Sequence, residues 1–524
     1  MTNVHVDQTA AMIQRARRNT LGDLLTRTVA RYPDKLAFTY KDRKLTYEAL
    51  DNLVNQTAHG LIKRGVKKGD RLALLSKNNL DFIIVMFATA RMGAVFIPIN
   101  YMLTKSDIAY ILKHAEVTGV FAEQTYIDTL EDAAKGLPIN HRFVLEAEDT
   151  TGVKWNPLKN IQHNQPMHPM ETNLHDDDLA HVLYTSGTES APKGVMLSHK
   201  SIIQEYVSCI IDGNMSAEDV LVHALPFYHS AQLHVFLGPS IYLGASGIIL
   251  DEASPAKIME TIESFEASQL FAPPTVWIAM LRDPSFDQFN LDSLEKCYYG
   301  AAIMPRKILV ELTERLPNAR FWNFYGQTEV APLATALQPE DQLRKLGSAG
   351  RPTLHVETKI VDDNNVEVPR GDIGEIVHRT PHAMLGYLND PEKTAEAFEN
   401  GWFHSGDLGT MDDEGYITIV DRKKDIINTG GVNVSSREIE EVIYQMTEVS
   451  EVAVIGVPDD YWIEAITAII VLKEEEAVTA DDVIDFCKKE LSTFKAPKHV
   501  HFTDTLPKNP SGKVLKKDLR DMYE

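Results

Sequence analysis

The sequence predicts an α/β protein with a large N-terminal domain of parallel sheets with helices plus a small β module, followed by a small α+β C-terminal domain. Three observations give this prediction. Helical and β-rich patterns alternate along the first half of the chain, and two β-rich runs with turn residues between them follow. The composition then changes after Arg422.

The alternation of helices and strands begins near residue 45. Apolar spacing predicts helices over 45–65, 80–93 and 126–136, and short apolar runs predict strands over 71–76, 94–99 and 118–123. This order is typical of a parallel sheet covered by helices on both faces. The runs 355–380 and 415–422 are β-rich and predict a small antiparallel module.

The last stretch of the chain predicts a compact domain of about 100 residues, the commonest domain size. Helices are expected over 438–446 and 479–492, the second opened by Thr479, and strands over 449–459 and 464–475. We therefore place the domains at residues 1–421 and 422–524.

Length and composition narrow the class of protein. With 524 residues the chain exceeds what one hydrophobic core usually supports. Its 75 acidic and 52 basic residues give a formal charge of −23, which disfavours nucleic acid as a partner. The chain has no signal-peptide pattern, no apolar run typical of a transmembrane segment and no paired cysteine spacing, and these features predict a cytoplasmic protein. If the chain assembles with itself, a homodimer is the expected assembly.

The stretch "YTSGTESAPKGV", residues 184–195, follows the apolar run "AHVL". A strand that ends in this loop can turn its amides toward an anion, helped by the hydroxyls of Ser186 and Thr188 and the ammonium of Lys193. The spacing is not that of a Walker loop. A plain surface loop has a similar composition, and Pro192 beside the lysine favours the anion-binding alternative because it fixes the backbone.

The stretch "NFYGQTEVAP", residues 323–332, predicts a second binding segment. An aromatic residue beside a glycine lets a flat ring lie close to a backbone. Thr328 and Glu329 add a hydroxyl and a carboxylate, which suits Mg²⁺ bound mainly by phosphates and water. A simple turn after a strand is the alternative.

Two further stretches lie nearer the C-terminus. Within 401–440, Asp407 follows Ser-Gly and can accept both hydroxyls of a ribose, with Arg422 as a reinforcing cation. Within 506–519, Lys513 follows a glycine on a predicted loop. A single charge of this kind is more often a solvated surface residue.

Taken in this order and spacing, the four stretches resemble the adenylate-forming superfamily of acyl-CoA synthetases, luciferases and adenylation domains. The likeness runs from "LTYEAL" to "SGKVLKKDL" and is closest to fatty-acyl-CoA synthetases. It implies ATP, Mg²⁺ and coenzyme A as cofactors and co-substrate, a small carboxylic acid as substrate, and a C-terminal domain that moves on a hinge.

The resemblance also implies a role for individual residues. ATP phosphates are assigned to Thr185, Ser186, Gly187, Thr188, Lys193 and Thr328, the nucleotide base to Gly300, Ala301, Asn323, Tyr325 and Gly326, the ribose to Asp407 and Arg422, and Mg²⁺ to Glu329. Lys424 takes the hinge position, and Lys513 is the mobile catalytic lysine, acting together with Thr188 and Glu329. Gly430 and Gly431 border the thiol tunnel. Glu189 and Ser190 depart from the usual Thr-Gly pair, which leaves the contacts in the middle of that loop open.

The acid itself is predicted to be apolar. The stretch "LPFYHSAQLHVF" borders the predicted acyl pocket and lacks the aspartate that would pair with an amino acid, and 225–250 contains no Arg or Lys for a second carboxylate. The runs "FAPPTVWIAML" and "EVAPLATAL" suggest an apolar lining, with space beside Ala302. His229 is either a gate of the tunnel or a buried core histidine.

These features predict an ATP-dependent fatty-acid–CoA ligase, an enzyme that forms an acyl-AMP and then a thioester on coenzyme A. The acid is expected to be a medium- or long-chain fatty acid. The alternatives are an aryl- or cinnamate-type CoA ligase, an adenylase that loads a carrier protein, and a nucleotide-binding protein without turnover.

Overall fold

The computed structural model describes residues 2–147, 155–185, 192–302, 304–459, 461–473, 476–508 and 514–523. The chain forms two compact units. Residues up to 185, 192–357 and 379–396 make the larger unit, and residues 358–378 and 397–524 make the smaller one.

The larger unit contains two sheets. Among the described residues, the first sheet has eight strands, in the order β19 (Gly386–Tyr387), β9 (Lys193–Ser198), β8 (Leu179–Thr185), β4 (Val95–Ile99), β3 (Arg71–Leu75), β5 (Gly119–Glu123), β6 (His141–Leu145) and β7 (Asn156–Pro157). The strands from β8 to β7 are parallel. Strand β9 pairs antiparallel with both β8 and β19.

The second sheet is also parallel in its centre. In the part of the chain that the structure describes it has nine strands, in the order β16 (Arg351–Pro352), β15 (Leu333–Leu337), β14 (Arg320–Gly326), β13 (Lys296–Gly300), β12 (Gln269–Phe271), β10 (Val220–His223), β11 (Ser246–Ile249), β1 (Leu36–Tyr40) and β2 (Arg43–Thr46). The pairs from β14 to β1 are parallel, and the edge pairs are antiparallel.

The predicted helices between the first strands are present. They are α3 (Tyr47–Lys63), α4 (Leu80–Met92) and α6 (Ile127–Ala133). Asn79 caps the start of helix α4, where its side chain accepts from Phe82 N–H, and Gly93, with a φ of 78°, caps its end. Every residue of α4 is buried, as expected for a helix that is apolar on all sides.

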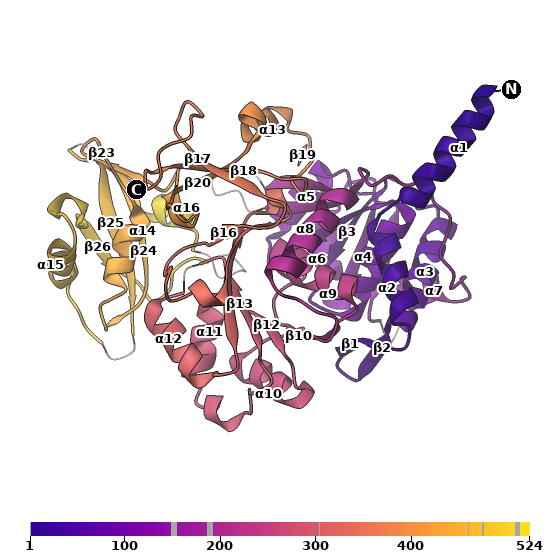
Figure 1. Cartoon of the computed structure of the whole chain (residues 1–524), viewed down its shortest axis with the longest axis horizontal. Coiled ribbons are helices and arrows are strands. Elements are labelled where there is room, and N and C mark those ends of the chain that lie inside the picture. The colour runs from indigo at the N-terminus through magenta and orange to yellow at the C-terminus, as the bar shows by residue number, and fades with distance from the viewer. Residues whose placement is uncertain are drawn as a thin grey trace. The chain divides into compact units, whose positions relative to one another are not determined.

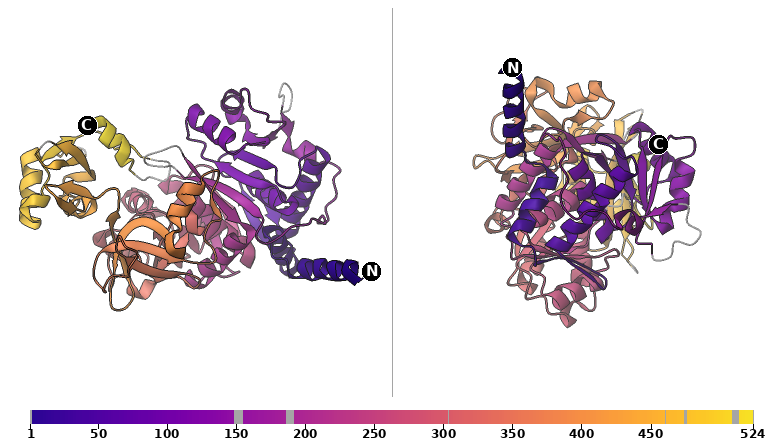
Figure 2. Two further views of the ribbon diagram at one scale, coloured as in Figure 1. Left: turned by 90° about the horizontal axis from the view of Figure 1, so that it is seen from above. Right: turned by 90° about the vertical axis from the view of Figure 1, so that its right-hand side faces the viewer.

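The larger unit contains further helices. They are α1 (Thr2–Arg17), α2 (Leu21–Arg31), α5 (Lys105–His114), α7 (Leu158–Gln162), α8 (His199–Asp212), α9 (Gly238–Leu243), α10 (Pro255–Phe265), α11 (Pro274–Arg282), α12 (Arg306–Arg315), α13 (Pro391–Ala397) and a π-helix over Ala231–Leu237. Helix α1 extends away from the rest of its unit in Figures 1 and 2.

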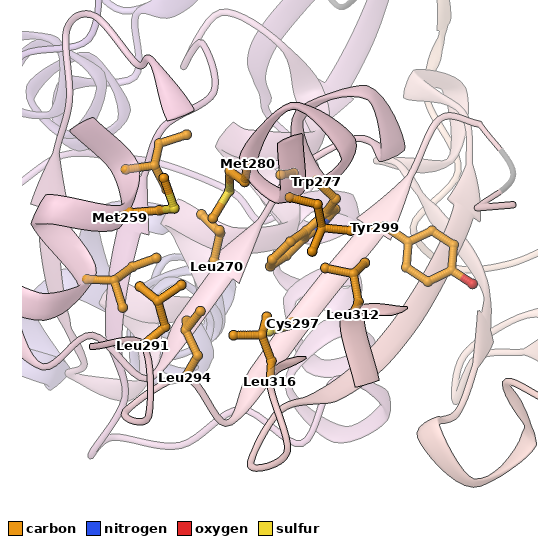
Figure 3. Close-up of a cluster of buried hydrophobic side chains, with 14 of the residues drawn as sticks. Met259, Leu270, Trp277, Met280, Leu291, Leu294, Cys297, Tyr299, Leu312 and Leu316 are labelled. Carbon is orange, nitrogen blue, oxygen red and sulfur yellow. The ribbon is translucent and has the colours of Figure 1, made fainter. Parts of the chain in front are cut away.

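A large hydrophobic core lies between the second sheet and helices α10, α11 and α12, which flank β12 and β13 in Figure 1. Figure 3 shows Trp277 among Leu270, Met280 and Leu312, all from this core. Trp277 is fully buried and its indole N–H donates to the carbonyl of Tyr298. The prediction that "FAPPTVWIAML" lines the acyl pocket is therefore wrong for Trp277, Met280 and Leu281, because these side chains face the core.

The smaller unit begins with the predicted β module, a sheet in the order β17 (Glu357–Val361), β18 (Gly374–Arg379), β20 (Phe403–Met411) and β21 (Ile417–Arg422). Its C-terminal part has strands β22 (Ile427–Thr429), β23 (Val432–Val434), β24 (Val449–Asp459), β25 (Ile463–Leu472) and β26 (His499–Phe502), and helices α14 (Ser436–Ile443), α15 (Ala480–Glu490) and α16 (Lys516–Tyr523). Thr479 caps α15 in a capping box with Asp482, as the sequence suggested.

The predicted fold class is confirmed: a large α/β unit rich in parallel strands precedes a smaller C-terminal region of mostly antiparallel sheet. Among the described residues from 427 to 502, the pairs β22–β23, β22–β25 and β24–β25 are antiparallel, and the pair β25–β26 is parallel. Within the described ranges, no helix is both long enough and apolar enough to cross a membrane.

Replacement of Trp277 by alanine tests the core. The truncation leaves a cavity beneath the sheet, and we expect the free energy of unfolding to fall by about 3–5 kcal/mol in urea denaturation followed by circular dichroism. Phe265, which is 38% exposed, is the control, and Phe265→Ala should cost less than about 1 kcal/mol. Equal losses would contradict the placement of Trp277.

Candidate active site

Parallel strands β12, β13 and β14 end at the same edge of the second sheet, at Phe271, Gly300 and Gly326. The carboxyl ends of parallel strands are the usual position for ligands in open α/β sheets. Gly300 and Gly326 were both predicted to contact the nucleotide. The structure therefore places these two residues at the edge where a ligand site is expected.

Positions 300 and 326 must be glycine because the backbone of a neighbouring segment lies too close for a side chain. A Cβ atom on Gly326 would lie 1.8 Å from the carbonyl oxygen of Pro332, and one on Gly300 would lie 2.5 Å from that of Phe324. Any side chain at either position would force the strand apart from its neighbour. Beyond β13, Ala301 has a φ of 64°, and Ala301 and Ala302 are exposed at the same edge.

Thr328 and Glu329 lie in a 3₁₀ turn, Thr328–Val330, directly after β14. The hydroxyl of Thr328 is 3.0 Å from that of Ser230, which joins this turn to the stretch predicted to border the acid. The carboxylate of Glu329 accepts a hydrogen bond of 3.0 Å from the Tyr387 hydroxyl. Its backbone carbonyl accepts one of 2.8 Å from the N–H of Met384.

Thr185 and Lys193 lie opposite each other where β8 and β9 pair. The Lys193 ammonium is 4.7 Å from the centre of the Tyr387 ring, because β19 pairs with β9 and carries Tyr387 beside it. One tyrosine thus contacts both the predicted phosphate-binding lysine and the predicted metal-binding carboxylate. Ser186, Gly187, Thr188 and Glu189 lie outside the described residues.

Tyr387 is a residue that the sequence analysis missed. Burial, followed by the nearby charge of Glu329, raises the pKa of its phenol, so that the hydroxyl stays protonated and able to donate. The only signal in the sequence is the pair Gly386-Tyr387, without an adjacent charge or a glycine-rich run. Its position became evident only through the pairing of β19 with β9.

The other predicted residues of this edge differ in their surroundings. Tyr325 is half-buried in β14. Asn323 is buried, and its amide donates 2.9 Å to the carbonyl of Ser348, so this side chain holds a neighbouring loop. His229 is half-buried, and its Nδ1 accepts from Ala231 N–H at 3.2 Å. Burial lowers the pKa of His229, which keeps the imidazole neutral.

The smaller unit brings the predicted ribose-binding pair together. Asp407 and Arg422 are direct cross-strand partners in β20 and β21, and the guanidinium Nε is 3.3 Å from the carboxylate. The side chain of Asp407 is only 6% exposed, whereas Arg422 is 37% exposed. The N–H of Asp407 donates to the Ser405 hydroxyl, which fixes the turn before it.

The segment after Arg422 is tied to helices α14 and α16. Lys424 is exposed, and the next residue, Asp425, pairs with Arg520 of α16 at 2.8 Å. Lys516, at the start of α16, donates to Ser436 and pairs with Glu440 of α14 at 2.8 Å. Lys513 lies outside the described residues.

Gly430 and Gly431 form the tip of the β22–β23 hairpin, with φ values of 62° and 82°. The N–H of Gly430 donates to the carbonyl of Trp462 at 2.6 Å, and the Lys498 ammonium is 4.7 Å from the centre of the indole ring. Tyr461, next to Trp462, is 81% exposed. An exposed aromatic and cationic surface therefore adjoins this hairpin, a feature that the sequence analysis did not predict.

The fold and the strand edge together are typical of an α/β enzyme that binds its ligand at the carboxyl ends of parallel strands. The family described as "AMP-binding enzyme" matches residues 25–388, and the one described as "AMP-binding enzyme C-terminal domain" matches residues 438–513. The chain belongs to the AMP-binding enzyme family, and it is an acyl-CoA synthetase of the adenylate-forming class.

Several relatives are similar along nearly their whole length. A putative acyl-CoA synthetase, YngI, of Bacillus subtilis is 32% identical (96% of this chain, 97% of that one). A feruloyl-CoA synthase of Amycolatopsis sp. is 31% identical (97% and 100%), and a long-chain-fatty-acid–CoA ligase of Salmonella typhi is 30% identical (98% and 96%).

Two solved structures are similar in fold as well. ATP-bound MatB from Rhodopseudomonas palustris has a TM-score of 0.87 at 30% identity, covering 96% of this chain and 99% of that one. A fatty acyl CoA synthetase of Mycobacterium tuberculosis has a TM-score of 0.77 at 32% identity, with 96% and 98% covered. The predicted superfamily and the predicted enzyme class are thereby confirmed.

Tyr387→Phe tests the role of the missed tyrosine. The variant keeps the ring beside Lys193 but loses the hydrogen bond to Glu329. A hydrogen bond to a charged group contributes about 1.5 kcal/mol. We therefore expect the KM for ATP to rise roughly tenfold. Tyr444→Phe, at a position 52% exposed, is the control and should leave KM unchanged. An unchanged KM in Tyr387→Phe would show that the hydroxyl does not position Glu329.

Asp425→Asn tests the connection between the segment after Arg422 and α16 through its pH dependence. Burial raises the pKa of Asp425, but Lys516 and Arg520 outweigh it and hold this pKa below the ordinary value of about 3.9. The charged carboxylate therefore stabilises the folded protein above that pH, and its contribution is lost as the pH falls toward the lowered pKa. We expect Asp425→Asn to lower stability in urea denaturation more at pH 6 than at pH 3. The same loss at both values would contradict the ion pairs.

Proposed function

We propose that this acyl-CoA synthetase activates a medium- or long-chain fatty acid, with an aryl or cinnamate-type acid as the second candidate. The observation that carries the proposal is a group of polar side chains linked through Tyr387: Lys193 of the first sheet, and Thr328 and Glu329 after β14 of the second sheet. An ammonium, a hydroxyl and a carboxylate are the groups that ATP phosphates with a bound cation require.

The donor set at this edge fits ATP with Mg²⁺. Glu329 would hold the cation, which would offset phosphate charge, while Lys193, Thr185 and Thr328 would bind phosphate oxygens. The Tyr387 hydroxyl orients the Glu329 carboxylate. Ser186, Gly187 and Thr188 are proposed to complete the phosphate-binding loop.

The remaining nucleotide contacts are proposed for residues of each unit in turn. Gly300, Ala301, Tyr325 and Gly326 would face the base, and Gly326 suits this role because a Cβ there is excluded. Asp407, held by Arg422, would accept the ribose hydroxyls. Asn323 is also proposed to contact the base, and its amide nitrogen donates to the carbonyl of Ser348.

The chemistry proceeds in two displacements. The substrate carboxylate attacks the α-phosphorus of ATP, the bond to the β-phosphate oxygen breaks, and pyrophosphate leaves. The thiol of coenzyme A then attacks the acyl carbon, AMP leaves with the electron pair, and the thiol proton is released. Positioned cations and amides stabilise the charge that spreads over phosphoryl oxygens in the first step.

The C-terminal domain, residues 422–524, is proposed to serve both steps. Lys513 would stabilise the first step, and the hairpin with Gly430 and Gly431 would border the thiol in the second. Lys424 is the proposed hinge, with a domain boundary between residues 421 and 422. The surface of Trp462 and Lys498 beside this hairpin offers a ring and a cation for the nucleotide end of coenzyme A.

The identity of the acid is supported by the apolar stretch and the relatives. The segment 225–250 lacks Arg and Lys, which disfavours a second carboxylate. Relatives named for long-chain fatty acids and for feruloyl-CoA match this chain at 30% and 31% identity, so both acid classes stay candidates. A carrier-protein-loading adenylase would instead place the acyl group on a protein thiol.

Pyrophosphate release measured over fatty, aryl and dicarboxylic acids, with and without coenzyme A, tests this proposal. We expect release with apolar monocarboxylic acids and acyl-CoA formation when coenzyme A is present. Lys513→Ala should lose acid-dependent pyrophosphate release yet still convert supplied acyl-AMP to thioester, because the lysine acts only in the first step.

Three outcomes would overturn parts of the proposal. Thioester formed on a carrier protein but never on coenzyme A would favour the loading enzyme. Equal loss of both half-reactions in Lys513→Ala would refute the role of that lysine. Release with dicarboxylic acids alone would refute the apolar acid.

A further inference from the structure

Five aromatic side chains pack together beneath the strand edge of the candidate site. This aromatic cluster consists of Phe236, Phe271, Tyr298, Trp322 and Phe324, each less than 8% exposed. Phe236 lies at its centre, stacked on Phe271 with ring centres 4.4 Å apart and ring planes at 17°. Its ring centre is also 5.1 Å from that of Tyr298 and 6.2 Å from that of Phe324.

The aromatic cluster adjoins the strand ends predicted to face the substrates. Phe271 is the last residue of β12, and a Cβ on Gly300, the last residue of β13, would lie 3.9 Å from its ring. Leu225 and Ala231, which belong to the stretch proposed to border the acid, are partly buried and pack against the hydrophobic core to which these rings belong. An acyl group bound at this edge that extends inward therefore meets the aromatic cluster.

Phe236 is held in place by its own helix. It belongs to the π-helix over Ala231–Leu237, a rare geometry often found at functional sites. The neighbouring His234 is fixed on both ring nitrogens, 3.0 Å from the hydroxyl of Tyr206 and 3.2 Å from Nδ1 of His181. Burial lowers the pKa of His234 to about 3, so the ring is neutral and the contacts persist at neutral pH.

The far side of the aromatic cluster is closed as well. The Tyr298 hydroxyl donates 2.7 Å to the carbonyl of Gly213, at the end of α8, and the ring of Phe324 comes within 3.3 Å of the Cβ position of that glycine. Rings packed at interior density do not move aside for a chain without losing their contacts. The aromatic cluster is therefore a fixed floor beneath the strand edge.

We propose that Phe236 sets the depth of the acyl pocket, and that the acid is one whose acyl part ends above this ring: a medium-chain or aryl acid and not a long-chain fatty acid. The inference rests on the proposed function and narrows it. The aromatic floor excludes a long chain by steric hindrance, and its ring faces offer stacking partners to a flat acid.

The test compares acids of different length in the full-length enzyme and in Phe236→Leu and Phe236→Ala. With octanoate, palmitate and ferulate as probes, we expect the wild type to use octanoate or ferulate with a kcat/KM at least about tenfold above that of palmitate. Both variants remove the ring that limits the depth of the pocket. The kcat/KM for palmitate, divided by that for the preferred shorter acid, should therefore rise about tenfold. Phe236→Leu conserves more of the packing and secures the measurement if Phe236→Ala does not fold.

Phe121→Leu is the matched control. Phe121 is also fully buried and stacked on a phenylalanine, Phe143 at 4.7 Å, but it lies in β5 of the other sheet. The Phe121→Leu variant should leave this ratio of kcat/KM values unchanged. A wild-type kcat/KM for palmitate equal to that of the better of octanoate and ferulate, or an unchanged ratio in a folded Phe236→Leu, would overturn the inference alone. No turnover with any acid would overturn the proposed function and this inference with it.

Discussion

Close approach of backbone to backbone is the constraint on which the strand edge of the larger unit depends. With a side chain at 326, β14 could not lie against the segment that carries Pro332, and with one at 300, β13 could not lie against β14. Because both positions are glycine, the turn after β14 brings Thr328 to Ser230 and Glu329 to Tyr387. The polar groups at this edge are thus positioned by two residues that contribute no side chain.

Periodicity and local chemistry were sufficient to predict much of the fold. Helix α4, with an asparagine before it and a glycine after it, begins and ends within a residue or two of its expected range. Strand β24 coincides with its predicted range of 449–459. Asp407 and Arg422 were predicted to act at the same ribose, and the structure makes them cross-strand partners in β20 and β21.

Long-range pairing accounts for what the sequence could not reveal. Tyr387 reaches Lys193 only because β19 adds to the antiparallel edge of the first sheet, some two hundred residues after β9 in the chain. The side of α11 that carries Trp277 faces the core and not a ligand, a choice that an apolar run does not encode. The π-helix brings Phe236 onto Phe271, and no periodic pattern in "AQLHVFL" distinguishes it from an ordinary helix.

The chain leaves the larger unit at residue 357, returns for residues 379–396, and leaves it again. This interleaving restricts how the protein can be dissected or recombined. A fragment that stops at 357 loses β19, which exposes the hydrogen-bonding edge of β9 to pairing with other molecules and so favours aggregation. A chimera with a relative must therefore exchange residues 379–396 together with the N-terminal segment, even though the residues on either side belong to the other unit.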